Sequence, residues 1–397
     1  MELFYHKQKR DQGPDSVPHI LGLSASPVRG SNIQEIHQVE QNLDSICVTP
    51  RIYRQELRAH VNRPEFTTLG FSEDLQPVRP GSALCTLRIL QRTVANDTED
   101  LLSQIAFQHG PVISPKSLER SEKERWTRTV MQYGRKAEHI YKELGPWASD
   151  YFILKTNQLY TGNTDTFTNT AFRHDEVLGK LLANYFDPPG SEYMITSTLV
   201  GHPDSLSEKA TKLVDLIGKR GLDTTGVIFV KERVVVSVLF QILSTHPQTA
   251  ERFKFATFVG LSNNVKRKAG INELLDLESQ NKSLEAFRVK QKHIIIATDV
   301  LEEGIDVTAC NLVICFDPPQ NLKSFIQRRG RARKERSQFI IMQPCTSNKT
   351  KTDRWIQLEE EVSRLCQDEK RAREKALSVE DQDEILDLVL RDRLTGY

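Results

Sequence analysis

The sequence predicts an α/β protein in which a parallel sheet carries an all-helical insertion and a helical C-terminal extension. Short apolar runs recur between residues 226 and 342, and the connections between them are long enough to hold helices, which is typical of a parallel sheet. Between about residues 86 and 182, apolar positions instead recur at helical spacing among charged ones. After Pro344 the chain becomes heavily charged, with a helical pattern.

The composition limits the kinds of site that the chain can hold. Its 397 residues suffice for two or three domains with a sizeable core. The 54 Lys and Arg residues nearly balance the 53 Asp and Glu residues, and the net charge is +1. Any polyanion site must therefore be a local patch. The six cysteines include no C-x-x-C pair, which argues against a zinc ribbon, and no metal site is predicted.

We expect an intracellular protein, cytoplasmic or nuclear, without membrane contact. The chain has no run of about eighteen apolar residues that could span a bilayer. Its first residues, MELFYHKQKRDQ, lack the apolar core of a signal peptide. Buried, reduced thiols are the simplest account of the six cysteines.

The N-terminal part is predicted to contain little sheet. The apolar run at 19–24 (HILGLS) predicts a short strand, and a polar helix is expected over 32–43. Residues 49–66 mix charged and aliphatic side chains and are interpreted as a linker. The all-helical insertion begins about twenty residues further on.

An amphipathic helix over 206–217, capped by Ser205 or Ser207, leads into the sheet. Strands are expected at 226–230, 255–259, 293–297, 311–316 and 338–342. Helices are expected between them at 233–243, 284–288 and 321–329. The tail shows a narrow apolar seam, as expected for a surface helix docked on its own domain: Trp355, Leu358, Val362 and Leu365.

An arginine-rich segment, SFIQRRGRAR (324–333), carries the clearest chemistry. Asn321 can cap the predicted helix, on which Gln327 and Arg331 lie one turn apart, and Arg333 follows just past its end. The planar guanidinium fork grips phosphate oxygens and stays charged, so two such groups suit a phosphoryl anion. Taken alone, the segment also fits an arginine-rich solvated helix end.

A second segment, ATDVLEEGIDV (297–307), supplies context for the arginines. A predicted strand ends at Ala297, Thr298 offers a hydroxyl and free backbone amides, and Gly304 permits a tight turn that presents Asp306. Loops at the carboxyl ends of parallel strands are where α/β sheets bind ligands. A G-I-D tripeptide is weak alone, but about twenty residues before QRRGRAR, with one strand between, it is specific.

This pairing resembles motifs five and six of superfamily-two helicases, whose second RecA-like domain closes on ATP held by the first. LGLSASP (21–27) resembles motif three, with Ser24 in place of the usual threonine, and GVIFVKER (226–233) resembles motif four. The helical insertion, ELGPWASDYFI (143–153) and the charged final helices are similar to fungal Dicer-like proteins, most of all the Dicer-like two class. The similarity spans nearly the whole chain.

The resemblance implies ATP and Mg²⁺ as cofactors, double-stranded RNA as the partner, and a role in RNA silencing and antiviral defence. It leaves room for a protein partner on the helical insertion. Duplex RNA would be read by shape and 2′-hydroxyls, with strongly salt-dependent binding. It also implies a RecA-like fold for the sheet.

The same resemblance assigns roles to individual residues. The catalytic arginine motif comprises Gln327, Arg331 and Arg333. Nucleotide contacts are expected from Gly304, Asp306 and Arg328. RNA contacts are expected from Thr298, Gly260 and the basic run Lys266, Arg267 and Lys268, although that run also fits a solvated loop. Coupling between ATP state and RNA grip is expected from Ser24 and Ser26.

The implied domains follow the motifs. Residues 1–48 would be a remnant of the first RecA-like domain with motif three, and residues 49–85 a linker leading into the second domain. The remaining segments would be the helical insertion (86–190), the second RecA-like domain (191–345) and a helical, pincer-like extension (346–397).

Two parts of a complete motor do not occur in the sequence. It contains neither a G-x-x-x-x-G-K-[ST] loop nor a D-E-x-H strand end, and no acidic ribonuclease III signature. We therefore expect a fragment of a Dicer-like ATP-dependent RNA helicase that does not hydrolyse ATP alone. The alternative is a non-catalytic, double-stranded RNA-binding or regulatory protein derived from a helicase.

Overall fold

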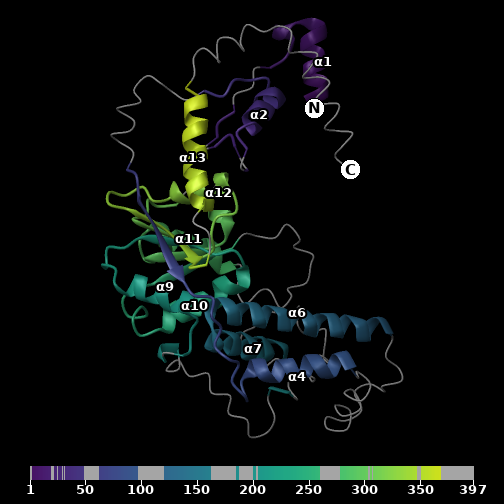
Figure 1. Cartoon of the computed structure of the whole chain (residues 1–397), viewed down its shortest axis with the longest axis vertical. Coiled ribbons are helices and arrows are strands. Elements are labelled where there is room, and N and C mark those ends of the chain that lie inside the picture. Colours follow the sequence, from purple (N-terminus) through teal and green to yellow (C-terminus); the bar gives the residue numbers. More distant parts are fainter. Residues whose placement is uncertain are drawn as a thin grey trace. The chain divides into compact units, whose positions relative to one another are not determined.

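The protein is described by a computed structural model and forms two compact units (Figure 1). Unit 1 comprises residues 1–64, 319–336 and 347–397, and unit 2 comprises residues 65–318 and 337–346. The structure describes residues 2–18, 22–24, 26–28, 30, 32–48, 62–96, 120–161, 185–186, 200–202, 204–259, 278–302, 305, 307–346 and 350–367.

Unit 2 is built on a six-stranded parallel sheet with the order β1-β6-β5-β2-β4-β3. The predicted parallel α/β sheet is therefore confirmed. Every residue of β2, β3, β4 and β5 is buried, as expected for strands covered on both faces. The strands are β1 (Glu65–Phe71), β2 (Gly226–Phe229), β3 (Phe255–Phe258), β4 (Ile294–Ala297), β5 (Leu312–Cys315) and β6 (Gln338–Pro344).

Helices connect these strands as the sequence predicted. The hydroxyl of Ser207, one of the two candidate caps, accepts a hydrogen bond from the Ala210 amide at 3.1 Å and so begins the first of them. Ser205 instead donates its hydroxyl to the Val200 carbonyl. The connecting helices are α9 (Glu208–Gly218), α10 (Arg233–Thr245) and α11 (Glu278–Arg288).

The edge strand β1 comes from the segment predicted as a linker. It pairs in parallel with β6 along its full length, from Glu65 opposite Gln338 to Phe71 opposite Pro344. Phe71 is the one residue of the strand that is fully buried. The sequence gives no strand signal here because an edge strand with one buried side chain has no apolar run.

The described part of the insertion is helical, and its helices lie side by side in Figure 1. They share one hydrophobic core with the sheet. The Tyr133 hydroxyl donates to the Ile153 carbonyl at 2.6 Å, which satisfies a polar group in the core. Gly145 has φ +102°, and a Cβ there would overlap the backbone of Leu206 and Ser207. The helices are α4 (Ala83–Asn96), α6 (Arg120–Leu144) and α7 (Pro146–Thr161).

Unit 1 contains helices in its described residues and no strand. The predicted strand at 19–24 is wrong for its described part: Gly22–Ser24 are outside any strand, and the Leu23 side chain is 89% exposed. An apolar run becomes a strand only beside a partner that satisfies its backbone groups. The helical elements are α1 (Glu2–Gln12), the 3₁₀ turn η1 (Pro14–Ser16), α2 (Glu35–Leu43), α12 (Leu322–Arg329) and α13 (Thr350–Leu365).

The apolar seam of the tail packs within unit 1. Trp355, Leu358 and Val362 are buried on α13, and the Trp355 ring lies 5.6 Å from the Phe325 ring on α12. The docked-helix interpretation is therefore confirmed for the described part of the tail. None of the described helices has the length and apolar character needed to cross a membrane.

Candidate functional site

The carboxyl edge of the sheet in unit 2 is the first candidate site. Because all six strands are parallel, the segments that follow them meet at one edge. Thr298 follows β4 there and is 4% exposed. Its amide donates to the Phe258 carbonyl at the end of β3 (3.2 Å), and a short 3₁₀ turn, Asp299–Leu301, begins after it. Thr298 therefore lies at this edge as predicted, but the prediction of a free backbone amide is wrong for Thr298, because that amide is bonded to Phe258.

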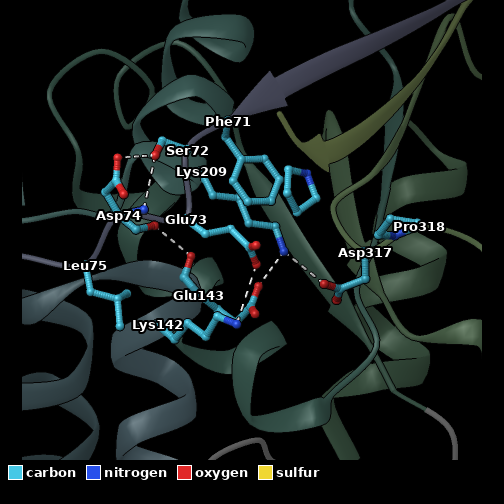
Figure 2. Close-up of a pocket in the computed structure, with 12 residues that line it drawn as sticks. Phe71, Ser72, Glu73, Asp74, Leu75, Lys142, Glu143, Lys209, Asp317 and Pro318 are labelled. Atoms are coloured by element: carbon cyan, nitrogen blue, oxygen red, sulfur yellow. Dashed lines mark hydrogen bonds and ion pairs between the residues drawn. The ribbon is translucent and has the colours of Figure 1, made fainter. Parts of the chain in front are cut away.

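A buried lysine lies close to this edge. The Lys209 ammonium, in the first turn of α9, makes ion pairs with Glu143 and with Asp317, the latter at 3.0 Å (Figure 2). It lies 3.9 Å from the centroid of the Phe316 ring and 5.3 Å from that of Phe71. Lys209 is only 5% exposed, so its charge requires compensation, which the two carboxylates and the ring faces supply.

Asp317 connects this lysine to the strand ends. Its second carboxylate oxygen accepts the Lys231 amide at 2.7 Å, just after β2. The neighbouring Val230 amide donates to the Ala297 carbonyl at 2.8 Å, at the end of β4. These two hydrogen bonds therefore link the segments after β5 and β2 to the end of β4. The last residue they reach is Ala297, next to Thr298.

The long helix α6 makes a second polar contact with this edge. His139 lies 3.5 Å from the Glu232 carboxylate, which immediately precedes α10. Lys136, one turn earlier on α6, has its pKa lowered by burial, and the charge of Glu232 partly offsets that effect. Together with Glu143 in its last turn, α6 presents a row of charged side chains to the carboxyl edge.

A pocket opens beside Lys209, and Figure 2 shows the side chains around it. Within it Lys142 pairs with Glu73 at 3.5 Å, and the Ser72 hydroxyl donates to Asp74 at 2.6 Å. Carboxylates outnumber ammonium groups, so this pocket is unsuited to a polyphosphate. Its lining is Phe71, Ser72, Glu73, Asp74, Leu75, Lys142, Glu143, Ser207, Lys209, Asp317, Pro318 and Pro344.

The arginine motif belongs to unit 1, where Asn321 caps α12 by accepting the Ser324 amide at 2.8 Å, as predicted. Gln327 lies on α12, but the helix ends at Arg329, so the prediction that Arg331 lies on it one turn further is wrong. After Gly330 the chain tightens into successive short turns. The Arg331 amide, for example, bonds the carbonyl three residues back.

The arginines of this motif have different environments. Arg328 is buried, while Arg333 is exposed and donates its Nε to the Gly330 carbonyl at 2.8 Å. Arg329 makes a two-pronged ion pair with Glu359 on α13, at 2.8 and 2.5 Å. Arg329 therefore joins two helices of unit 1.

Ser24 and Ser26 form a compact turn in unit 1. The Ser24 hydroxyl donates to the Ser26 carbonyl at 2.6 Å and accepts the Ser26 amide at 3.1 Å, while the Ser26 hydroxyl donates to the Val28 carbonyl. Six other predicted site residues lie outside the described residues: Gly304, Asp306, Gly260, Lys266, Arg267 and Lys268.

Sequence reasoning missed the Lys209 cluster, although a signal was present. Lys209 stands three residues after Leu206 and four before Leu213, so the helical period places it on the apolar face. A lysine on such a face needs a buried partner. Asp317 directly follows a predicted strand, where polar groups gather in α/β sheets. Among the residues that the structure describes, no group of three His, Cys, Asp or Glu side chains could hold a metal ion.

The parallel sheet, and an arginine-rich helix that lies between β5 and β6 in the sequence, are the features that the sequence predicted for a helicase C-terminal domain. In agreement, the family described as the helicase conserved C-terminal domain matches residues 208–335. The chain therefore carries a helicase C-terminal domain and, along its length, is similar to fungal Dicer-like protein 2.

Three relatives give the extent of that similarity. Dicer-like protein 2 of Aspergillus fumigatus is 36% identical over 405 residues, covering 100% of this chain and 28% of the relative. The Aspergillus terreus protein is 37% identical over 408 residues, with shares of 97% and 28%. The Cryphonectria parasitica protein is 36% identical over 398 residues, with shares of 96% and 26%. The chain thus spans less than a third of each of these relatives.

One solved structure shows a weaker likeness. The helicase domain of Pyrococcus furiosus Hef aligns with 88% of this chain and 69% of its own, at 18% identity and a TM-score of 0.40. That score is too low to support the fold, which rests on the sheet topology.

Proposed function

We propose that this chain is the second motor half of an ATP-dependent RNA helicase that acts on double-stranded RNA in RNA silencing. The observation that supports it most is the similarity to Dicer-like protein 2 over the whole chain, at about a third identity. The segment predicted as motif four contains β2 of the parallel sheet, and the segment predicted as motif five begins at the end of β4. The predicted domain boundaries, from the motif-three remnant to the pincer-like extension, are part of this proposal.

The arginines that would meet ATP suit its phosphates. Arg331 and Arg333 follow α12 on short turns, and the planar guanidinium group matches phosphoryl oxygens. ATP, when bound, supplies the phosphoryl transfer that drives strand separation. The role of Arg331 and Arg333 would be to neutralise the negative charge that builds on the transferred phosphoryl group.

Such arginines act only when another domain places Mg²⁺-ATP opposite them, because they stabilise the transition state only from the correct position. The sequence contains no phosphate-binding loop and no D-E-x-H strand end. The chain alone is therefore proposed to bind duplex RNA without hydrolysing ATP. Joined to a first RecA-like domain that carries those motifs, it would hydrolyse ATP when RNA is present.

Duplex binding is tested by fluorescence anisotropy with a labelled RNA of about 20 base pairs, over about 50 to 200 mM salt. The change is to replace Lys266, Arg267 and Lys268 by alanine together. If all three contact phosphates, the slope of log affinity against log salt falls by about 2 to 3. The control is Arg364→Ala, because this arginine is exposed on α13 and pairs only with its helical neighbour Glu360 among the ion pairs described. An unchanged slope in the triple variant would remove that run from the site.

ATP turnover is tested in the joined protein. We expect RNA-stimulated hydrolysis that falls by about 10³-fold in Arg331→Ala, in the range of arginine fingers in phosphoryl transfer. Arg364→Ala again serves as the control. RNA binding that is indifferent to ATP, together with no turnover in the joined protein, would instead establish a non-catalytic RNA-binding protein.

A further inference from the structure

We propose that Lys209 is a positioning residue for the RNA-binding edge of the sheet, and that it links this edge to the helical insertion. The inference rests on the proposed function, because it assumes that Thr298 and the neighbouring loops meet RNA. Lys209 does not itself reach the edge. It acts through Asp317 on one side and Glu143 of α6 on the other.

The contacts form one path through unit 2. Glu143 stands in the last turn of α6, Lys209 in the first turn of α9, and Asp317 two residues after β5. From Asp317 the path runs to the Lys231 amide at 2.7 Å. It continues along the main chain to the Val230–Ala297 hydrogen bond of 2.8 Å, and so to the residue before Thr298. Each step is an ion pair, a hydrogen bond or the peptide bond between Val230 and Lys231, so a shift of α6 has a physical route to the end of β4.

Stability alone is a poor reason for this cluster. Burying an ammonium group and two carboxylates costs several kcal/mol per ion, and a buried ionic cluster is often no more stable than apolar groups of the same volume. What a buried ionic cluster provides is a fixed arrangement, because each charge tolerates few positions of its partners. Here the arrangement that is fixed includes the turn after β2, through Asp317.

The pocket next to the cluster agrees with a positioning role. Glu73 and Asp74 also line the pocket, and Glu143 and Asp317 retain 18% and 22% side-chain exposure. The carboxylates therefore have an alternative in water if Lys209 is removed. Loss of the lysine would then free Asp317 to move and loosen the Lys231 amide, while the apolar core of the sheet stays in place.

The test measures duplex RNA affinity and its salt slope in Lys209→Met, Lys209→Arg and the unsubstituted chain, well below each melting temperature. We expect Lys209→Met to bind about 5- to 10-fold more weakly at every salt concentration, with an unchanged slope, because no phosphate contact is lost. Lys209→Arg keeps the charge and should bind within about twofold of the unsubstituted chain. Lys212→Met, one turn along α9, is the matched control, since Lys212 pairs with Glu208 and donates to the Gly70 carbonyl at 2.6 Å, and neither partner belongs to the Lys209 cluster.

A second readout follows the structure directly. Hydrogen exchange of the peptide that contains the Lys231 amide should be faster in Lys209→Met and unchanged in Lys212→Met. If Lys209→Met fails to fold, the triple variant Glu143→Gln, Lys209→Met, Asp317→Asn removes every charge of the cluster, and its affinity should fall in the same way.

Several outcomes would overturn the proposal. Equal affinity of folded Lys209→Met and the unsubstituted chain would reduce the cluster to a structural role. If the slope of log affinity against log salt is lower by about 0.9 in Lys209→Met, Lys209 contacts a phosphate directly. Wild-type affinity in the triple variant would also refute it. If the unsubstituted chain binds no duplex RNA at any salt concentration, the proposed function itself fails, and that result is distinct from the other three.

Discussion

Asp150 should make the stability of the helical insertion depend on pH. This carboxylate lies on α7 and accepts the Leu84 amide at 3.1 Å, at the start of α4. Burial is the main cause of a raised pKa, from 3.8 to about 6, and the hydrogen bonds from the amides of Ala83 and Leu84 and the charge of Arg79 only partly oppose it. The change we would make is Asp150→Asn, which keeps an acceptor oxygen for the α4 amides and removes the titration.

The sign follows from the direction of the shift. A folded-state pKa above the unfolded value means that the folded protein holds the proton more tightly. The contribution of Asp150 to the stability of the folded protein is therefore fully present below about pH 4 and is lost as the pH rises to about 6. A shift of about 2 pKa units corresponds to about 3 kcal/mol, at 1.36 kcal/mol per unit. This is the upper limit of what the titration of Asp150 contributes to the free energy of unfolding.

The assay compares the melting temperatures of the unsubstituted chain and Asp150→Asn between about pH 4.5 and 7.5. Because other titrating groups are common to both proteins, their effects cancel in the difference. We expect Asp150→Asn to gain relative stability as the pH rises, by up to a few kcal/mol, with the steepest change near pH 5 to 6. A difference in melting temperature that is constant across this pH range would show that burial does not raise the pKa of Asp150.

Three further substitutions test individual packing features. Gly145→Ala should destabilise unit 2 by about 2 kcal/mol or more, measured by urea unfolding, because φ is positive and a Cβ would overlap Ser207; wild-type stability would contradict the left-handed turn. Tyr133→Phe should cost about 1 to 3 kcal/mol by the same measurement, since the Ile153 carbonyl loses its buried donor, and no loss would mean that water replaces it. Trp355→Ala should lower the melting temperature of unit 1 through a loss of about 3 to 5 kcal/mol, and a neutral result would show that the seam is not packed.

The sheet could be predicted because its inner strands leave a simple trace in the sequence. Runs such as IIIA at 294–297 are buried on both faces, so they are continuously apolar, and their short length favours strands over helices. β1 left no such trace, since only Phe71 is buried, Leu69 is partly buried, and the strand exists through its pairing with β6. The run ending at Ser24 shows the reverse case, an apolar pattern without a paired neighbour in the described part of unit 1.

The candidate site was predictable where local sequence fixes it and unpredictable where distant residues meet. Asn321 and Thr298 stand at a helix start and a strand end, and both positions follow from neighbouring residues. The placement of Arg331 on one helix face with Gln327 did not follow, because the helix ends at Arg329 and Gly330 begins a tighter turn that periodicity alone does not show. The meeting of Lys209 with Glu143 and Asp317 joins residues 66 and 108 positions away, which one sequence cannot reveal.

The pairing of β1 with β6 has a consequence for synthesis of the chain on the ribosome. Glu65 and Gln338 are 273 residues apart, and at about 5 to 20 residues per second β1 waits roughly 15 to 55 seconds for its partner. Helices α4, α6 and α7 can form locally during that time, whereas β1 lacks its strand partner. Nascent chains therefore carry a strand with open backbone groups until β6 has been made, which favours association between neighbouring polysomal chains. Expression at low temperature or with chaperones should raise the yield of folded protein for this reason.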